Sequence, residues 1–293
     1  AMGMADTVMA ASCGEAVVSG ISLVDSICVL LIGLFTAMAS GGAVVAAQYM
    51  GHGDKEMVGR ASNQLFLAVG GVALLFMTIA LIWNKGLLAL LYGNVEADVM
   101  SAARIYFYIV AVSFPFLGIY NGGAALFRAV GDSKVSMKVS LVANLVNIAG
   151  NAVLIFGFHI GVAGAAISTL ASRILMSIIM ICRQRVPKQE IVIRDYFSIR
   201  PDMKLILIIL SVGIPSGIEN GMFQFGKLAI QSTVSTLGTT AIAAQAMTII
   251  LENLNGIAAI GIGIGLMTII GQCIGAGEKE QAVYYIKKLA VLS

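Results

Sequence analysis

Long apolar segments separated by short polar turns constrain the fold of this chain more than any other feature. Seven segments of 20 residues or more cover residues 16–48, 64–83, 104–127, 136–158, 160–182, 204–234 and 239–272. A helix that spans a bilayer needs about 20 apolar residues, so each segment is long enough to cross. Backbone polar groups in lipid must be hydrogen-bonded internally, and strand-like alternation is absent. We therefore expect helices rather than a transmembrane barrel.

The composition leads to the same class of protein. Hydrophobic residues make up 59% of the 293 residues and charged residues only 11%, whereas soluble domains are about half apolar and a quarter charged. These charges are too few to cover soluble domains of this length. The same composition excludes a disordered chain, a coiled coil and a nucleic-acid-binding protein. We predict an all-α polytopic membrane protein.

Both ends of the chain fall within apolar helical patterns. Residues 1–11 form a stretch that contains Asp6 and is shorter than a bilayer span, and residues 281–293 begin another pattern. No basic region of the kind that opens a signal peptide precedes the first stretch. We expect a fragment of a longer membrane protein, truncated within both outermost helices.

Basic residues are concentrated on one side of the predicted helices. Of the 18 Lys and Arg residues, 14 fall in loops after alternate helices, whereas the opposite loops hold only Lys85 and Arg104. Positive charge marks the cytoplasmic side of a membrane protein. We therefore expect a multi-pass protein of the inner (cytoplasmic) cell membrane with its basic loops in the cytoplasm.

A nine-residue string occurs twice, 224 residues apart. Residues 48–56 read QYMGHGDKE and residues 272–280 read QCIGAGEKE, with five identical positions. Both copies end a long apolar segment on the same predicted side of the membrane, so the repeat is parallel. Parallel repeats are typical of secondary transporters, and six spans within the offset imply a complete protein of about twelve helices.

A basic connection containing Pro187 and Pro201 divides the chain into two unequal parts. We expect residues 1–185 to form an N-terminal lobe and residues 186–203 to be a cytoplasmic linker. Residues 204–293 then begin a C-terminal lobe related to the first by the parallel repeat.

Charged residues inside the predicted spans are the main candidates for function. They are Asp6, Asp25, Arg173, Glu219, Lys227 and Glu252. Each costs about 2.5–3.5 kcal/mol at a helix centre on insertion scales, so the default interpretation is an ion or substrate pathway. The structural alternatives are a helix-end cap for Asp6 and a salt bridge between Glu219 and Lys227 that makes insertion tolerable. For Arg173 we expect snorkelling toward the cytoplasm instead.

Polar residues around these charges suggest two sites. Asn147 and Asn151 share one helix face, and Thr169 of the next helix can approach them, which together offers oxygen ligands suited to Na⁺. The alternative is hydrogen bonding that only joins the two helices. Glu219 and Lys227 lie near one face, with Gln224 close by, and are expected to gate a cavity or bind a cationic substrate. Asp25 and Glu252 are further substrate-cavity candidates.

Several strings resemble the multidrug and toxic compound extrusion (MATE) transporters, in order and over essentially the whole chain. They are Met4 to Met9 with Gly14, Gln48 to Asp54, Phe127 to Lys134, Asn147 to Thr169, and Gly213 to Pro215. Each string is short, and the parallel repeat adds to their specificity. By this resemblance the chain runs from the end of helix 1 to the start of helix 9, with helices 7 and 8 opening the second lobe.

The resemblance implies a twelve-helix antiporter that exports organic, often cationic, compounds in exchange for Na⁺ or H⁺. Two lobes rock between inward-open and outward-open states. Asp6 is similar to the family's ion-binding acid, and Asn147 and Thr169 resemble its partners. At Asn151 the DNA-damage-inducible branch usually has Asp, so this pocket has one carboxylate fewer. The norfloxacin-exporter branch has a glutamate about one turn beyond Glu219.

The resemblance also sets expectations about ligands and partners. No cofactor is expected beyond the coupling ion, Na⁺ or H⁺, with Na⁺ held by Asp6, Asn147, Asn151 and Thr169. The partners are the lipid bilayer and a small organic substrate, with no nucleic acid, and the protein is expected to be a monomer.

Three interpretations other than a complete antiporter were considered for the function of this chain. The cysteines and histidines lack metal-ligand or catalytic spacing, so an enzyme is not expected. A lipid-linked saccharide flippase of the same superfamily would line its cavity with several arginines, and only Arg173 is available here. A third alternative is a fragment that is inactive by itself.

Overall fold

The computed structural model describes the whole chain except residues 1–5, 7, 93–95, 186–200, 236–238 and 291–293. The described residues are helical, with no strand among them. The helices are η1 (Ala11–Cys13), α2 (Glu15–Gly51), α3 (Lys55–Ile82), α4 (Asn84–Tyr92), α5 (Ala97–Ala111), α6 (Phe114–Ala129), α7 (Ser133–Asn151), the π-helical turn η2 (Ala152–Gly157), α8 (Val162–Gln184), α9 (Met203–Ser235), α10 (Thr239–Gly275) and α11 (Lys279–Ala290). The predicted all-α fold is confirmed.

The predicted spans match these helices closely. Within the described part of the chain, five helices are long and apolar enough to cross a membrane, or six if α5 and α6, which meet at a bend of 53°, form one span. The seventh predicted segment lies on α10, where the described apolar portion is Ala259–Gly275. The predicted linker falls mostly on residues 186–200, outside the described residues.

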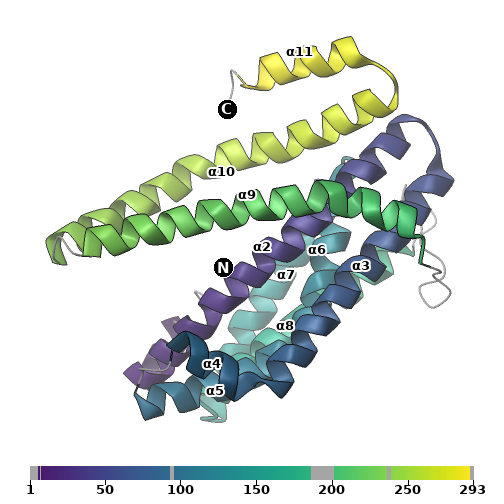
Figure 1. Cartoon of the computed structure of the whole chain (residues 1–293). Helices are drawn as coiled ribbons and strands as arrows, with labels where there is room; N and C mark the ends of the chain where they lie inside the picture. Colours follow the sequence, from purple (N-terminus) through teal and green to yellow (C-terminus); the bar gives the residue numbers. More distant parts are fainter. Residues whose placement is uncertain (1–5, 7, 93–95, 186–200, 236–238, 291–293) are drawn as a thin grey trace.

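Helix α2 is the element that the others share. It packs against α3, α5 and α6 of the bundle and also against α9 and α10. Helices α7 and α8 form a hairpin whose second helix packs on α5 and α6. Figure 1 shows α9 and α10 side by side, crossing the bundle near the end of α2 and extending away from it. The described part thus consists of an N-terminal bundle and a helical pair docked on α2.

The repeated string folds into the same turn twice. Helix α2 ends at Gly51 and α10 at Gly275, and in each copy the second glycine adopts a positive φ, 76° at Gly53 and 81° at Gly277. L-residues with a side chain rarely adopt this conformation, so glycine suits both positions. Equivalent backbone hydrogen bonds close both turns. The predicted repeat is therefore a repeat of structure as well as of sequence.

The two copies also pack against each other. A Cβ atom on Gly51 would overlap the carbonyl oxygen of Gln272, and a Cβ atom on Gly275 would overlap that of Gln48. Gln48 and Gln272, like the two glycines, are equivalent positions of the repeat. This reciprocal contact relates α2 and α10 by an approximate two-fold axis, with their backbones in direct contact.

Candidate functional site

Asp6 is fully buried, and its carboxylate is the centre of a polar cluster. Its Oδ1 accepts hydrogen bonds from Nδ2 of Asn147 at 3.1 Å and of Asn151 at 2.7 Å. Its Oδ2 accepts from the Tyr106 hydroxyl at 2.9 Å and from the Thr169 hydroxyl. The structure thus brings together the four residues predicted for the ion site and adds Tyr106. We call these five residues the Asp6 pocket.

The hairpin of α7 and α8 positions three of these residues. Asn147 and Asn151 lie one turn apart on α7 and are fully buried, as is Thr169 on α8. The hydroxyl of Ser168 donates to the Asn147 carbonyl oxygen at 2.7 Å, and the two helices approach closely at Gly150, beside Ser168. Immediately after Asn151 the chain forms the π-helical turn η2, a feature often found at functional sites.

The asparagine side chains of the Asp6 pocket are only partly satisfied. Their Oδ1 atoms are buried and have no hydrogen-bond partner among the described residues. A buried polar atom without a partner typically costs about 1–3 kcal/mol, and in native structures it usually marks a bound ion, a water or a functional role. The donor set of one carboxylate, two amides and two hydroxyls suits a hard cation such as Na⁺, because all its oxygens are hard ligands.

Tyr106 was not predicted as part of this site. It lies on α5, 100 residues from Asp6, and only 1% of it is exposed. A buried tyrosine hydroxyl usually needs a hydrogen-bond partner. That need is the signal by which the sequence could have suggested Tyr106 as part of a polar site. The sequence alone does not say which partner that is, because nothing local orients α5 toward Asp6.

The prediction for Arg173 was wrong. Its side chain does not snorkel to the surface: it is 6% exposed, and Nη1 donates to the Ser113 Oγ at 2.7 Å. Ser113 lies at the break between α5 and α6, where the helix axis bends and side-chain hydroxyls can reach a neighbouring helix. The bend offers the guanidinium an internal partner, which hydropathy along the chain cannot reveal.

None of the predicted substrate-cavity residues whose side chains the structure describes belongs to the Asp6 pocket. Glu219 and Gln224 are exposed on α9, and the Nζ of Lys227 lies 4.9 Å from the centre of the Phe223 ring. Asp25 is half-buried on α2. The side chain of Glu252, on α10, lies outside the described residues.

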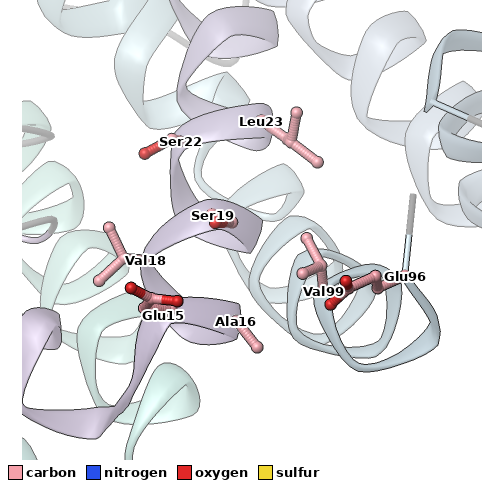
Figure 2. Close-up of a pocket in the computed structure, with 8 residues that line it drawn as sticks. All are labelled: Glu15, Ala16, Val18, Ser19, Ser22, Leu23, Glu96 and Val99. Carbon is pink, nitrogen blue, oxygen red and sulfur yellow. The ribbon is translucent and has the colours of Figure 1, made fainter. Parts of the chain in front are cut away.

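A surface hollow of about 630 Å³ lies between the start of α2 and the start of α5 (Figure 2). Glu15, Ser19, Ser22 and Glu96 supply its polar groups. None of the predicted site residues that the structure describes lines this hollow.

A multi-pass helical fold with a buried carboxylate held by side chains from several helices is typical of membrane transporters. A comparison with protein-family models identifies one family: the MatE model matches residues 1–153 and 215–293. The chain therefore belongs to the MatE family and is a multi-pass membrane protein.

Individual relatives agree with this assignment. The chain is 27% identical to "Probable multidrug resistance protein NorM" of Thermotoga maritima, with 99% of the chain and 63% of the relative covered. It is 25% identical to "Uncharacterized transporter YisQ" of Bacillus subtilis, with 97% of the chain and 62% of the relative covered. The chain thus spans less than two thirds of the length of these relatives.

Solved structures share the fold. "Crystal structure of MATE in the bent conformation" matches with a TM-score of 0.90 at 19% identity, covering 98% of this chain and 64% of that one. "Outward-facing conformation of a multidrug resistance MATE family transporter of the MOP superfamily" matches with a TM-score of 0.85 at 17% identity, covering 99% and 64%.

Proposed function

We propose that these residues belong to a secondary antiporter that exports organic, often cationic, compounds in exchange for Na⁺ or H⁺. The observation that carries the proposal is the Asp6 pocket, a buried carboxylate surrounded by neutral donors inside a membrane bundle. Relatives named as multidrug resistance proteins support the substrate class. On this proposal the Asp6 pocket binds the coupling ion.

The energetics of the pocket favour a cation. Asp6 accepts four hydrogen bonds and has no ion-pair partner among the described side chains. An ionised carboxylate taken out of water carries a penalty of several kcal/mol, which neutral donors offset only in part. A proton or Na⁺ at the carboxylate would remove much of that penalty.

The asparagines can serve either occupancy state. Their Nδ2 atoms donate to the free carboxylate, while their Oδ1 atoms have no partner among the described residues. A rotation of about 180° around the terminal torsion exchanges the two atoms of each amide. The amide oxygens of Asn147 and Asn151 would then bind Na⁺ or accept a hydrogen bond from protonated Asp6.

Substrate recognition is proposed for charged and polar residues that are not part of this pocket. Asp25 on α2 and Glu219, Gln224 and Lys227 on α9 are the candidates, with Glu252 on α10. Rocking of an N-terminal lobe (residues 1–185) against a C-terminal lobe that begins at residue 204 would alternate access to them. The basic loops, including the linker 186–203, would face the cytoplasm.

The test uses the full-length protein that contains these residues, assayed for dye efflux under separately imposed Na⁺ and pH gradients. Asp6→Asn should abolish efflux driven by the physiological gradient, and the gradient that drives the unmodified protein identifies the ion. Asn147→Ala should weaken coupling. The matched control is Asn144→Ala, because Asn144 lies one turn away on α7 and donates to the Ser140 carbonyl of its own helix. Unchanged efflux in Asp6→Asn would overturn the proposal.

A further inference from the structure

Helix α4 (Asn84–Tyr92) is too short to cross a membrane and takes no part in the Asp6 pocket. It follows the spanning helix α3 without a loop, because the Trp83 carbonyl already accepts the first hydrogen bond of α4, from the Leu87 N–H. The 9 residues of α4 form a helix about 14 Å long, roughly half of the 30 Å hydrocarbon core of a bilayer. Since α3 begins in the repeated turn, α4 lies at the opposite end of that span.

One face of α4 holds the helix against the bundle. Leu88 is fully buried, and Asn84, one turn earlier, is 8% exposed. The Nδ2 of Asn84 donates to the Arg104 carbonyl oxygen of α5 at 3.5 Å. Helix α4 packs against α5 and the end of α3, and Figure 1 shows it at that end of the bundle. The buried face therefore fixes which side of α4 points outward.

The outward side of α4 is apolar and continues an exposed apolar stripe of α3. On α3, Leu75, Ile79 and Ile82 follow one another at helical spacing and are 57%, 38% and 79% exposed. Trp83 and Leu90 come next and are 65% and 82% exposed. At about 100° per residue, Leu90 falls on the same side of α4 as Trp83. A contiguous apolar surface of this kind marks contact with a membrane or a partner, and here it begins on a membrane-spanning helix.

Polar groups lie at the edge of this apolar side. The Trp83 ring lies over the first turn of α4, because a Cβ atom on Gly86 would be 3.0 Å from its Cδ1 and Nε1 atoms. Lys85 is exposed and lies about 140° around the helix from Leu90. Among the described residues, neither the indole N–H nor the Lys85 ammonium has a hydrogen-bond or ion-pair partner. Both groups are donors suited to the carbonyl and phosphate oxygens of lipid headgroups.

We propose that α4 is an interfacial helix that lies in the headgroup boundary of one leaflet. Trp83 and Leu90 face the acyl chains, and Lys85 faces the lipid phosphates. Helices of this type bury an apolar face about 5–10 Å into the boundary and keep basic residues on the polar side. The occupant of this surface is phospholipid rather than protein, because the surface continues the lipid-facing stripe of α3.

The leaflet is the one at the end of α3 that lies opposite the repeated turn. In the orientation proposed above it is the outer leaflet. There α4 sets the depth at which this end of the N-terminal bundle sits in the membrane. This role depends on the multi-pass fold and not on ion binding at Asp6.

The first experiment uses the fluorescence of Trp83, the one tryptophan in these 293 residues. The full-length protein is reconstituted into vesicles of phosphatidylglycerol and phosphatidylcholine, with bromine on the acyl chains of the phosphatidylcholine. Subtracting the emission of Trp83→Phe removes the signal of any tryptophan elsewhere in the full-length protein. Bromine near the headgroup end of the chains should cause a larger loss of Trp83 emission than bromine near the chain ends. No loss with either lipid, or an equal or larger loss with bromine at the chain ends, would overturn the proposal.

The second experiment compares two sides of α4 with spin labels in the same vesicles. Leu90→Cys and Lys85→Cys are labelled separately in a full-length variant whose native cysteines are replaced by serine. Lys85 is the matched control, because it is exposed on the same helix but lies at the polar edge. Oxygen concentrates in lipid and a nickel chelate stays in water, so the Leu90 label should collide more with oxygen and the Lys85 label more with nickel.

The remaining outcomes contradict the proposal. Equal ratios of oxygen to nickel collisions at the two positions would mean that α4 lies entirely in water or entirely in the hydrocarbon core. Few collisions of the Leu90 label with either reagent would mean that protein covers this surface, from the rest of the full-length chain or from a second copy. Should a cysteine variant fail to fold, the quenching of Trp83 decides by itself.

Discussion

Replacing Gly51 with alanine should separate α2 from α10. A Cβ atom at this position would lie closer than 3.0 Å to the carbonyl oxygen of Gln272, which is backbone and cannot rotate away. The helices must move apart, and the reciprocal contact of Gly275 with Gln48 must open with them. The change therefore acts on the whole contact between the two copies of the repeat.

The size of the effect follows from three contributions. Overpacking of a tight contact costs about 1–3 kcal/mol. The separation also strains two bonds that hold α10 to the end of α6, from Gln272 Nε2 to the Ala129 carbonyl (2.9 Å) and from Thr268 Oγ1 to the Arg128 carbonyl (3.1 Å), each worth about 1 kcal/mol. The gain in helix propensity from Gly to Ala, about 1 kcal/mol, offsets part of this. A net destabilisation of about 2 kcal/mol is expected.

The assay is thermal unfolding of the full-length protein in detergent, where this destabilisation should lower Tm by roughly 2 °C. Gly33→Ala is the matched control, because Gly33 lies on the same helix and has no atom within 4 Å of the added Cβ. It should leave Tm unchanged or raise it slightly. Gly275→Ala should reproduce the effect of Gly51→Ala, since the two contacts are reciprocal. Equal Tm values for Gly51→Ala and Gly33→Ala would refute the reasoning.

Two further predictions concern the Asp6 pocket and the contact between the repeats. Tyr106→Phe removes a neutral donor to Asp6 and should lower Tm by a few degrees, because a buried carboxylate loses about 1–3 kcal/mol of hydrogen bonding; the exposed Tyr108→Phe is the control. Cysteines at Ala47 and Gly271 should form a disulfide under mild oxidation, because a Cβ on Gly271 would lie 2.8 Å from the Ala47 Cβ and a small shift gives disulfide geometry.

Each of these predictions has an outcome that contradicts it. A Tyr106→Phe variant as stable as Tyr108→Phe would mean that the hydroxyl contributes nothing to the pocket. The disulfide is tested with Cys273 replaced by serine and is read from gel mobility with each single cysteine as the control. Failure of the pair to cross-link would mean that α2 and α10 do not meet in this register.

The helices were predicted correctly because their formation depends on local chemistry. A backbone in lipid must satisfy its own polar groups, so runs of apolar residues long enough to cross become helices wherever they lie in the fold. The bend of 53° between α5 and α6 was not predicted, although Pro115 in the first turn of α6 is a local signal for a helix break. That bend is what brings Ser113 within reach of Arg173.

The Asp6 pocket was predictable in part. The spacing of Asn147 and Asn151 puts both on one face of a helix, and the short turn after α7 makes α8 its neighbour, so their meeting with Thr169 follows from local rules. The position of Asp6 against them came from the family resemblance rather than from spacing. Tyr106 needed the packing of α5 against both, which is a contact between distant segments.

The sequence by itself determined the membrane class, the helices and the repeat, because hydropathy and glycine-containing turns act within a few residues. Tertiary structure alone decided that the repeat packs against itself at Gly51 and Gly275, and that Arg173 faces inward. Both depend on how helices far apart in the chain approach one another. Two helices approach closely where the residues at their contact are small and where buried polar groups find hydrogen-bond partners. These conditions exist only once the helices are assembled.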